Sequence, residues 1–510
     1  MAQSLIEGPH LPPVDMFTFL IPLFLQCLLL HPYFPPFLSR PIRFLLMPFS
    51  VTLSFSAPYR YAIEPRNQAV GVNFVCGIMG GYGIWKGLEW GLARDLTPYT
   101  WVGHEEQVRE KEVKNGFASA GSSADESANG SANGSAGDGK AEKQLSKEQQ
   151  KRRRAEEKKA EHSRLLSLRA QQARTEGPMM ILRSTLHLLI AMRGQGYAFC
   201  GTSTLPFPRS PRAFFRRLSL EIAWSHPLLT ACAALLLEPA TSRDAWLAAH
   251  IPAAVSRSQT HLLGEAITGL SMGVAVFAAL TLGYSLATML VFLPNVVGRA
   301  VLPARLRPPP FDARSYPPLF NFARRPSSVS RFWSKQWHSF FSRPFRFLAF
   351  DPVQGLSAPL VGKLVARTLG VLAVFALSSW IHEYGLATAT STLSSSPHPP
   401  PPASEMPFHL RWGGSLYFMA QGVGIILEGG FTAVSGRKVG GWIGTVWTAL
   451  FCVVAGRWLV ESWLTQGLLR EVPPVRYWSW QRFVLPLGCL QPPPLWMKSL
   501  PSSYAYERHV

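Results

Sequence analysis

The sequence predicts an all-α, polytopic membrane protein with about eight to ten membrane helices, on three observations. Only 16% of the 510 residues are charged, whereas soluble domains carry about 25%. Hydrophobic residues make up 47% and aromatic residues 12%, including 16 Trp. Apolar segments recur along the chain at about the 20 residues that one bilayer crossing needs. These features argue against a cytosolic enzyme, a secreted disulfide scaffold and a fully disordered chain.

Eight segments are long and apolar enough to be predicted as membrane spans. They are 16–32, 42–58, 69–93, 219–237, 266–295, 358–390, 412–434 and 441–465. Residues 266–298 carry no charged side chain and exceed one crossing, so we expect tilt, a bend or an interfacial end there. The segments 178–192 and 476–489 are shorter, which is typical of interfacial or re-entrant helices.

Two segments between the spans have the composition of linkers. Residues 103–175 are small and polar, then rich in Lys and Arg in KEQQKRRRAEEKKAEHSR. Such a sequence buries too little apolar surface to fold. Between spans, we interpret it as a disordered cytosolic loop with affinity for anionic lipid, in preference to a nucleic-acid or nuclear-import patch. The prolines of 391–405 exclude a helix and predict an extended linker.

The distribution of positive charge predicts the orientation of the chain. The loop 299–347 carries ten Lys and Arg residues against one acid, Asp312, and cytosolic loops are enriched in Lys and Arg. We therefore place this loop and 103–175 in the cytosol and the N-terminus on the other side. Asn129 and Asn133 match the sequence pattern of glycosylation acceptors. Because this topology places them in the cytosol, we expect them to stay unmodified.

The alternation of apolar spans and charged segments divides the chain into five regions. They are the N-terminal spans 1–102, the basic loop 103–175, the middle membrane helices 176–298, the basic interfacial segment 299–347 and the C-terminal membrane helices 348–510.

The strongest chemical candidate lies in the segment VLAVFALSSWIHEYGLATA. His382 and Glu383 interrupt a run without other charges, and His382 lies about 22 Å along a helix from Arg367. Ionisable residues at that depth are costly and mark functional sites. Burial favours a neutral imidazole, which is the form that a general base requires. The alternative is a His that hydrogen-bonds between helices.

A second candidate is the aromatic and basic segment SVSRFWSKQWHSFFSRPFRF. On a helix, Phe332, Trp333, Gln336 and Trp337 would share one face. The other polar residues, Arg331, Lys335 and His338, would be partly displaced from it. Trp and Arg of this kind anchor interfacial helices at lipid headgroups. The functional interpretation is a cytosolic lid whose Arg331 and Lys335 hold the phosphates of an anionic donor while His338 points into the membrane.

A third candidate is the segment LYFMAQGVGIILEGG. Gln421 and Glu428 are seven residues apart and share one helix face. Because a carboxylate in an apolar run needs a partner or a proton, both residues are candidate substrate contacts or polar bonds between helices. No paired cysteine spacing indicates a zinc site or disulfide framework.

These pieces occur in an order that resembles a known family. FWSKQWH, the span with SSWIHE, then QGVGIILE and GWIGTVWT are similar to the wax-synthase-like branch of the membrane-bound O-acyltransferases, over residues 325–460. MRGQGYAFC at 192–200 resembles another motif of that branch, with Tyr197 where the branch has Trp. The sequence departs from the branch at Ser379 and Trp380, which replace a small Gly-apolar pair.

The resemblance implies a bundle of tilted helices that encloses a tunnel, usually in the endoplasmic reticulum. It implies transfer of an acyl group from acyl-CoA to a lipophilic alcohol, without metal or tightly held cofactor. The catalytic base would be His382 and the second active-site residue His338. Trp333, Trp337, Arg331, Lys335, Gln421 and Glu428 are the candidate substrate contacts.

Two functions from other classes stay open at this point. A secondary transporter would use His382, Glu383 and Glu428 as a proton relay, but the chain has no repeated half and the FWSKQWH segment has no task in that scheme. A membrane scaffold would bind partners through 103–175 and tolerate loss of both histidines.

Overall fold

The computed structural model describes most of the chain between residues 18 and 468. The described ranges are 18–61, 70–96, 177–197, 210–237, 240–251, 256–304, 306–308, 310–322, 325–391, 401–402 and 404–468, with residues 99, 101, 168 and 171. Within them the elements are helices, and the one extended pairing is a bridge between Trp101 and Tyr197. The all-α prediction is therefore confirmed for these residues. Outside the described residues lie the basic loop 103–175 with its two acceptor Asn residues, apart from residues 168 and 171, most of the linker 391–405, and 476–489.

The chain forms two compact units. One consists of Met1–Ile21, Pro48–Glu89 and Leu205–Val510, and the other of Pro22–Met47 and Trp90–Thr204. The second unit contains most of α1 (Leu20–Leu28), the first part of α2 (Pro36–Arg60), and α6 (Pro178–Ile190). Inside it, the buried Arg43 donates hydrogen bonds to the backbone carbonyls of Trp90 and Ala93.

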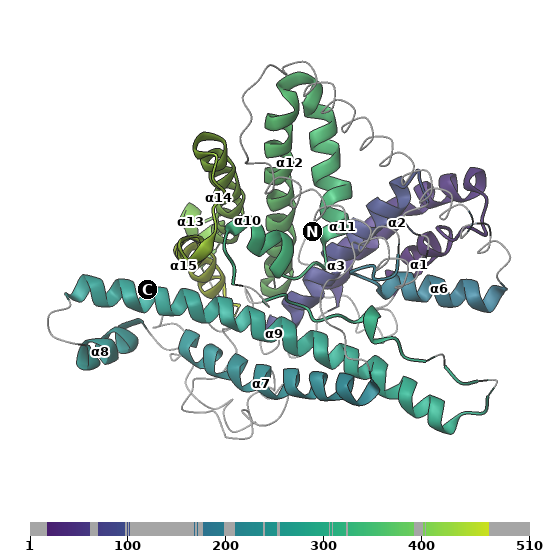
Figure 1. Ribbon diagram of the computed structural model, residues 1–510, viewed down its shortest axis with the longest axis horizontal. Helices are drawn as coiled ribbons and strands as arrows, with labels where there is room; N and C mark the ends of the chain where they lie inside the picture. Colours follow the sequence, from purple (N-terminus) through teal and green to yellow (C-terminus); the bar gives the residue numbers. More distant parts are fainter. Residues whose placement is uncertain are drawn as a thin grey trace, which may run out of the picture. The chain divides into compact units, whose positions relative to one another are not determined.

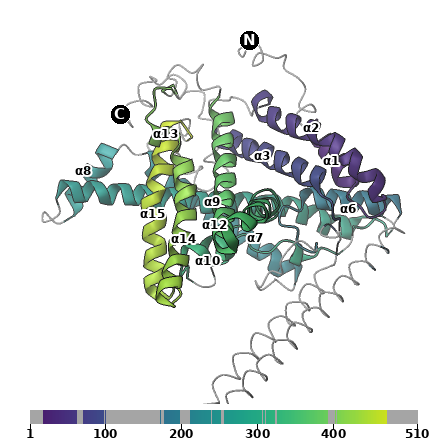
Figure 2. The ribbon, with the colours of Figure 1, turned by 90° about the horizontal axis from the view of Figure 1, so that it is seen from above.

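The first unit contains the long helices and the candidate site. Its helices are nearly all of α3 (Val70–Leu92), α7 (Pro211–Leu237), α8 (Ala240–His250), α9 (Arg257–Val301), α12 (Asp351–Thr390), α13 (Phe408–Arg411), α14 (Gly413–Ser435) and α15 (Gly441–Thr465). Short helical turns lie between them: η5 (Ala313–Ser315), α10 (Val329–Arg331), η6 (Phe332–Gln336), α11 (Ser342–Pro344) and η7 (Phe345–Phe350). The helix α7 packs along α9 (Figure 1), and α14 lies beside α15 (Figure 2).

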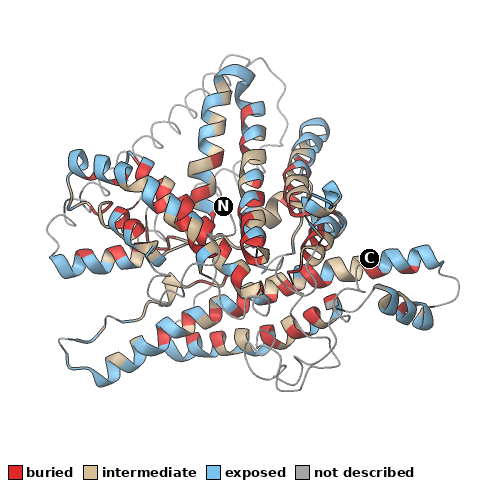
Figure 3. Cartoon of the chain, turned by 180° about the vertical axis from the view of Figure 1, so that it is seen from behind, coloured by how far each residue is buried: buried red, intermediate tan, exposed pale blue. Residues whose placement is uncertain are grey.

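Five helices in the described part of the chain are long and apolar enough to cross a membrane. They are Pro211–Leu236, Arg257–Val301, Ser342–Thr390, Gly413–Ser435 and Gly441–Thr465. They fall on five of the eight predicted spans. The outer faces suit hydrocarbon, because Leu360, Val434 and Val454 are 84%, 91% and 71% exposed, and soluble proteins seldom expose large apolar patches. Figure 3 shows buried residues gathered where helices face one another.

The three N-terminal span predictions have a different outcome. The segments 42–58 and 69–93 coincide with α2 and α3, which reach the length of a crossing but not the apolar composition of the other five. The segment 16–32 is not a full crossing, because α1 has 9 residues and covers about 14 Å of the roughly 30 Å of hydrocarbon. Pro32, Pro35 and Pro36 follow α1 closely and prevent its continuation.

The apolar segment 266–298 lies within one long helix, α9. This helix has 45 residues and starts with a capping box between Ser256 and Gln259. At 1.5 Å per residue it is about 68 Å long, more than twice the hydrocarbon thickness. The expected excess length is therefore confirmed, and polar residues of the first turns, such as His261 and Glu265, extend the helix beyond its apolar part.

The helix α12 consists of two arms, not the single span that the sequence predicts over 358–390. Gly362 has φ 79° and ψ 161° inside it, and Figure 1 shows the two arms meeting at a turn. This backbone conformation is accessible essentially to glycine alone, which is why the break occurs here. The arm that carries His382 therefore begins at Lys363. Its 15-residue separation from Arg367 is unchanged, so the expected depth of His382 stays the same.

A single apolar cluster brings together the helices around the candidate site. It includes Leu236 of α7, Met272 of α9, Phe375 of α12, Phe418 of α14 and Trp463 of α15. The helices α14 and α15 approach closely at Gly413, where a Cβ atom would clash with the backbone carbonyl of Trp458. The absence of a side chain at Gly413 thus allows the two helices to pack against each other beside α12.

Candidate active site

His382 is partly buried on the second arm of α12 and has one ring nitrogen committed to the backbone. Its Nδ1 lies 2.7 Å from the carbonyl oxygen of Ser378, one turn earlier. Because a carbonyl only accepts, Nδ1 carries the proton, and in the neutral ring Nε2 is left as an acceptor. The structure thus gives His382 the tautomer that a general base needs.

Two aromatic rings border the imidazole of His382. The ring centroid of Phe418 on α14 lies 4.4 Å away, and that of Trp463 on α15 lies 6.1 Å away with an interplanar angle of 20°. Phe418 is 5% exposed and Trp463 is 4% exposed. The base candidate is therefore enclosed by apolar walls, which exclude water from its surroundings.

Glu383, the neighbour of His382, fixes the start of α14. One oxygen of its carboxylate, Oε1, accepts hydrogen bonds from the backbone N–H of Ser415 at 2.8 Å and from its hydroxyl at 3.0 Å. Ser379 donates to the same hydroxyl at 2.7 Å. A carboxylate at a helix N-terminus is stabilised by the free N–H groups and the helix dipole. Glu383 therefore positions α14 against the arm that carries His382.

The FWSKQWH segment is not the regular helix that the sequence predicts. It folds as α10 followed by the wide turn η6, in which the N–H of Trp337 donates to the carbonyl of Phe332 at 2.9 Å. Trp337 itself is extended and ends the turn. Such five-residue turns often occur at functional sites. The expected pairing of Trp333 with Trp337 is nevertheless present, with ring centroids 5.6 Å apart.

Trp333 and Gln421 meet at the wall of the site. The indole Nε1 of Trp333 donates to Oε1 of Gln421 at 3.0 Å, and the Trp333 ring contacts Phe418, the neighbour of His382, at 6.4 Å. Gln421 is fully buried, and its Nε2 has no hydrogen-bond partner among the described residues. A buried amide donor without a partner is costly, so it is a candidate contact for a substrate oxygen.

Glu428 anchors the beginning of the FWSKQWH segment. Its carboxylate accepts hydrogen bonds from the backbone N–H groups of Val329 at 2.6 Å and Ser330 at 3.0 Å. It also accepts one from the indole of Trp447 at 3.0 Å. Next to it, Gly444 of α15 lies so close to the carbonyl of Ser327 that a Cβ atom would clash. With both oxygens bonded to protein donors, Glu428 has a positioning role.

His338 lies in a second aromatic group. Its ring contacts those of Phe340 at 5.3 Å, Trp337 at 5.6 Å and Phe341 at 5.8 Å. From Phe341, ring contacts continue through Trp85 to Trp380, two residues before His382. A second series of ring contacts runs from Trp337 through Trp333 to Phe418, which contacts His382, so aromatic contacts join the two candidate histidines.

The two basic candidates differ in exposure. Lys335 is exposed, and Arg331 is partly buried with its Nε lacking a hydrogen-bond partner among the described residues.

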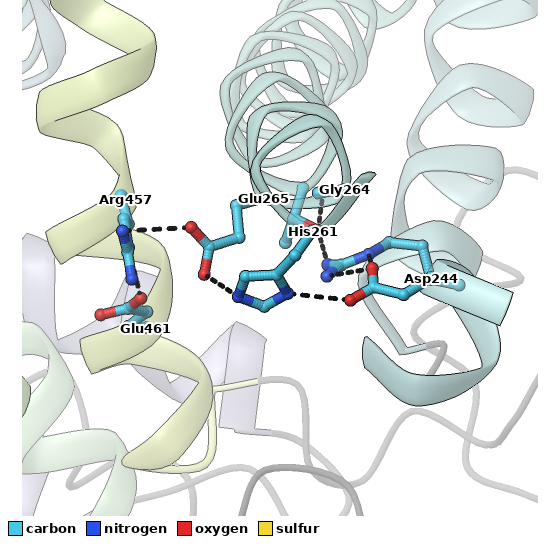
Figure 4. A network of polar contacts seen from close by, with 8 residues as sticks. Asp244, His261, Gly264, Glu265, Arg457 and Glu461 are labelled. Atoms are coloured by element: carbon cyan, nitrogen blue, oxygen red, sulfur yellow. Dashed lines mark hydrogen bonds and ion pairs between the residues drawn. The ribbon is translucent and has the colours of Figure 1, made fainter. Parts of the chain in front are cut away.

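A separate network of charged residues joins α8, α9 and α15 (Figure 4). Nδ1 of His261 lies 2.8 Å from Asp244, and Nε2 lies 3.1 Å from Glu265. Glu265 also pairs with Arg457 at 3.1 Å, and Arg457 pairs with Glu461 at 2.8 Å. The network holds three helices together, and its residues were not candidates from the sequence because the three helices are far apart along the chain.

Sequence reasoning missed two residues at the site, Phe418 and Trp463, whose rings lie beside His382, and it did not foresee that Glu383 positions α14. Only Glu383 carried a signal, its position next to an intramembrane His. Phe418 and Trp463 are apolar residues in apolar spans and look like ordinary packing residues in the sequence.

The fold and site define an all-α protein of the membrane with a histidine base candidate in one of its spans. Residues 316–399, which include the FWSKQWH segment and His382, match the model of the Membrane bound O-acyl transferase family. This match supports a membrane-bound O-acyltransferase. No curated protein and no solved structure gives a significant match to the chain.

Proposed function

We propose that this chain transfers an acyl group from acyl-CoA to the hydroxyl of a lipophilic alcohol, as the wax-synthase-like enzymes do. The observation that carries the proposal is His382. Its Nδ1 donates to a backbone carbonyl, its Nε2 is left as an acceptor, and apolar rings border it inside a membrane helix. The family match over the same residues supports acyl transfer as the reaction.

In the proposed reaction, Nε2 of His382 takes the proton of the alcohol as its oxygen attacks the thioester carbonyl. The new C–O bond forms, the C–S bond breaks, and the CoA thiolate leaves. The imidazolium of His382 returns the proton to the thiolate, so no other co-reactant is required. Exclusion of water by Phe418 and Trp463 protects the thioester from hydrolysis.

The second step of the proposal assigns donors to the acyl group. His338 positions the thioester or stabilises the developing oxyanion. The buried Nε2 of Gln421, which has no partner among the described residues, is offered to the thioester oxygen. Trp333 orients this amide through its hydrogen bond to Oε1, and Trp337 packs against Trp333. Glu428 and Glu383 act as positioning residues for the two halves of the site.

The basic segment 299–347 suits the phosphates of acyl-CoA. It carries ten Lys and Arg residues and one acid, and its exposed Lys335 with the neighbouring Arg331 lies on the same turn as Trp333. We place this segment at the cytosolic face of the endoplasmic reticulum membrane, where the acyl donor is soluble and the acceptor arrives from lipid. The proposed acceptor classes are long-chain alcohols, sterols and terpenoid alcohols.

A secondary transporter is less well supported. Its proton relay would need the carboxylates of Glu383 and Glu428 to exchange protons with changing partners. Each of them instead accepts hydrogen bonds from backbone N–H groups in fixed positions. Such bonds hold each carboxylate in one geometry, whereas a relay needs partners that change.

The proposal is tested with membranes that contain the wild type or His382→Ala. Radiolabelled acetyl-CoA or palmitoyl-CoA is combined with fatty, sterol and terpenoid alcohols, and labelled ester is measured. We expect ester from the wild type and a loss of about 10²–10⁴-fold in the variant, the usual contribution of a general base.

The control for this assay is His261→Gln, which changes a histidine of the charged network and is expected to retain the wild-type rate. Equal ester formation by wild type and His382→Ala would remove His382 from the mechanism and bring the transporter or scaffold forward.

A further inference from the structure

Trp463 holds a buried hydrogen-bond donor beside His382 that the mechanism above does not use. Its side chain is 4% exposed and packs against Phe74 and His382. Its Nε1 has no hydrogen-bond partner among the described residues. In contrast, the indoles of Trp333 and Trp447 donate to Gln421 and Glu428. An indole N–H can only donate, and leaving it unpaired inside a protein is costly.

The surroundings of this N–H indicate which chemical group it would take. A Cβ atom at Gly414 would lie 3.1 Å from Nε1 of Trp463 and 2.8 Å from Oε1 of Glu383. The donor and the carboxylate therefore both lie against the same side of Gly414, where there is no side chain. The carboxylate would repel an anion such as an oxyanion or a phosphate. A neutral hydroxyl oxygen, which can accept one hydrogen bond and carries no negative charge, is compatible with both neighbours.

We propose that Nε1–H of Trp463 binds the hydroxyl oxygen of the acceptor alcohol, an inference that rests on the proposed function. The oxygen accepts from the indole and donates its proton toward Nε2 of His382. This arrangement directs a second lone pair of the oxygen at the thioester carbonyl. The C–O bond then forms and the C–S bond breaks as described above. Trp463 neither gains nor loses a proton. Trp463 thus determines that the acceptor is a hydroxyl compound and fixes its orientation at the base.

The test compares Trp463→Phe with Trp458→Phe in the full-length protein. Phe keeps an aromatic ring against His382 but removes the N–H. Trp458 lies on the same helix and is 39% exposed, so its variant is a matched control. With palmitoyl-CoA and the alcohol that the wild type prefers, kcat and KM are measured for each substrate, together with thermal stability and palmitoyl-CoA hydrolysis.

For Trp463→Phe we expect kcat/KM for the alcohol to fall about three- to tenfold, the worth of one neutral hydrogen bond. The KM for palmitoyl-CoA and its slow hydrolysis should stay within about twofold of the wild type, because the proposed hydrogen bond is made to the alcohol and not to the acyl donor. Stability should be unchanged or slightly higher, because the variant no longer buries an unpaired donor. Trp458→Phe should match the wild type throughout.

Three results would overturn the inference. Wild-type kinetics in Trp463→Phe would show that no substrate uses the N–H. A loss of stability that parallels the loss of activity would assign the indole to packing or to a bond with Glu383. A wild type that is folded but forms no ester with any alcohol would refute the proposed function itself, and this binding role with it.

Discussion

His261 and His382 lie on helices of the same unit and have opposite polar environments. Both ring nitrogens of His261 face carboxylates, at 2.8 Å and 3.1 Å, and both can donate only when the ring is protonated. His382 donates once, to a backbone carbonyl, and its surroundings are aromatic. The comparison shows that two carboxylates engage both ring nitrogens of a histidine in contacts between and along helices. A single neutral partner leaves the second nitrogen available for chemistry.

The carboxylates of the charged network and those of the candidate active site differ in the same way. In the network of Figure 4, Glu461 pairs with the side chain of Arg457, and each is at least one-third exposed. At the site, Glu428 is 7% exposed and bonds to fixed N–H groups. Exposed ion pairs contribute little free energy, whereas an unpaired buried donor costs about 1–3 kcal/mol. The network therefore tolerates substitution better than the site does.

The largest effect on stability is expected from Glu428→Gln. The amide keeps one acceptor oxygen but turns an NH₂ group toward the backbone N–H groups of Val329 and Ser330. We expect destabilisation of about 2–4 kcal/mol, because at least one buried donor loses its partner. Thermal unfolding of the purified protein in detergent measures it. The matched control is Glu461→Gln, with an expected change below about 1 kcal/mol; equal effects of the two changes would contradict the contrast.

An intermediate effect is expected at the break of α12. Gly362→Ala forces a Cβ atom into a backbone conformation that costs of order 1–3 kcal/mol for other residues, although the space around Gly362 is open. Gly355→Ala, on the first arm, also meets open space but in helical backbone, where Ala is favoured by roughly 0.5–1 kcal/mol. The two variants should therefore shift the unfolding temperature in opposite directions. Shifts of the same sign would show that the arms do not separate at Gly362.

The sequence predicts those parts of the fold and site that depend on local composition. Five apolar segments were located from hydropathy, and His382 was identified because ionisable residues are rare in such segments. The break at Gly362 was missed because the sequence holds 41 glycines and nothing local marks Gly362 as one that adopts positive φ. The wide turn at Phe332–Gln336 was missed because its aromatic spacing fits a regular helix equally well.

Contacts between distant segments could also not be predicted from the sequence. Glu383 meets Ser415 across 32 positions, and Trp463 meets His382 from another helix. Gln421 and Glu428 were correctly placed on one helix face, but their partners were not predictable. Trp333 lies 88 positions from Gln421, and Val329 lies 99 from Glu428. Such pairs are set by the packing of helices, which periodicity along one helix does not encode.

The smallest effect on stability is expected from Asp244, the carboxylate that the charged network contains on α8. Burial raises the pKa of Asp244, but hydrogen bonds and charges from His261 and Arg243 outweigh it and leave the pKa below its ordinary value. Because the pKa of Asp244 is lower in the folded protein than the unfolded value of about 3.9, its ionised carboxylate stabilises the fold at pH values above about 3.9. This stabilisation is lost as the pH falls through the folded value.

The unfolding temperatures of wild type and Asp244→Asn should therefore differ at neutral pH and converge below about pH 4. Asp351→Asn is the control, because Asp351 lies 3.7 Å from Arg346 and both side chains are about half exposed or more, so its difference from wild type should be small at every pH. A difference for Asp244→Asn that persists into acid would mean that the carboxylate stabilises the network through packing and not through its charge. The comparison of His261 with His382 would then lose its electrostatic basis.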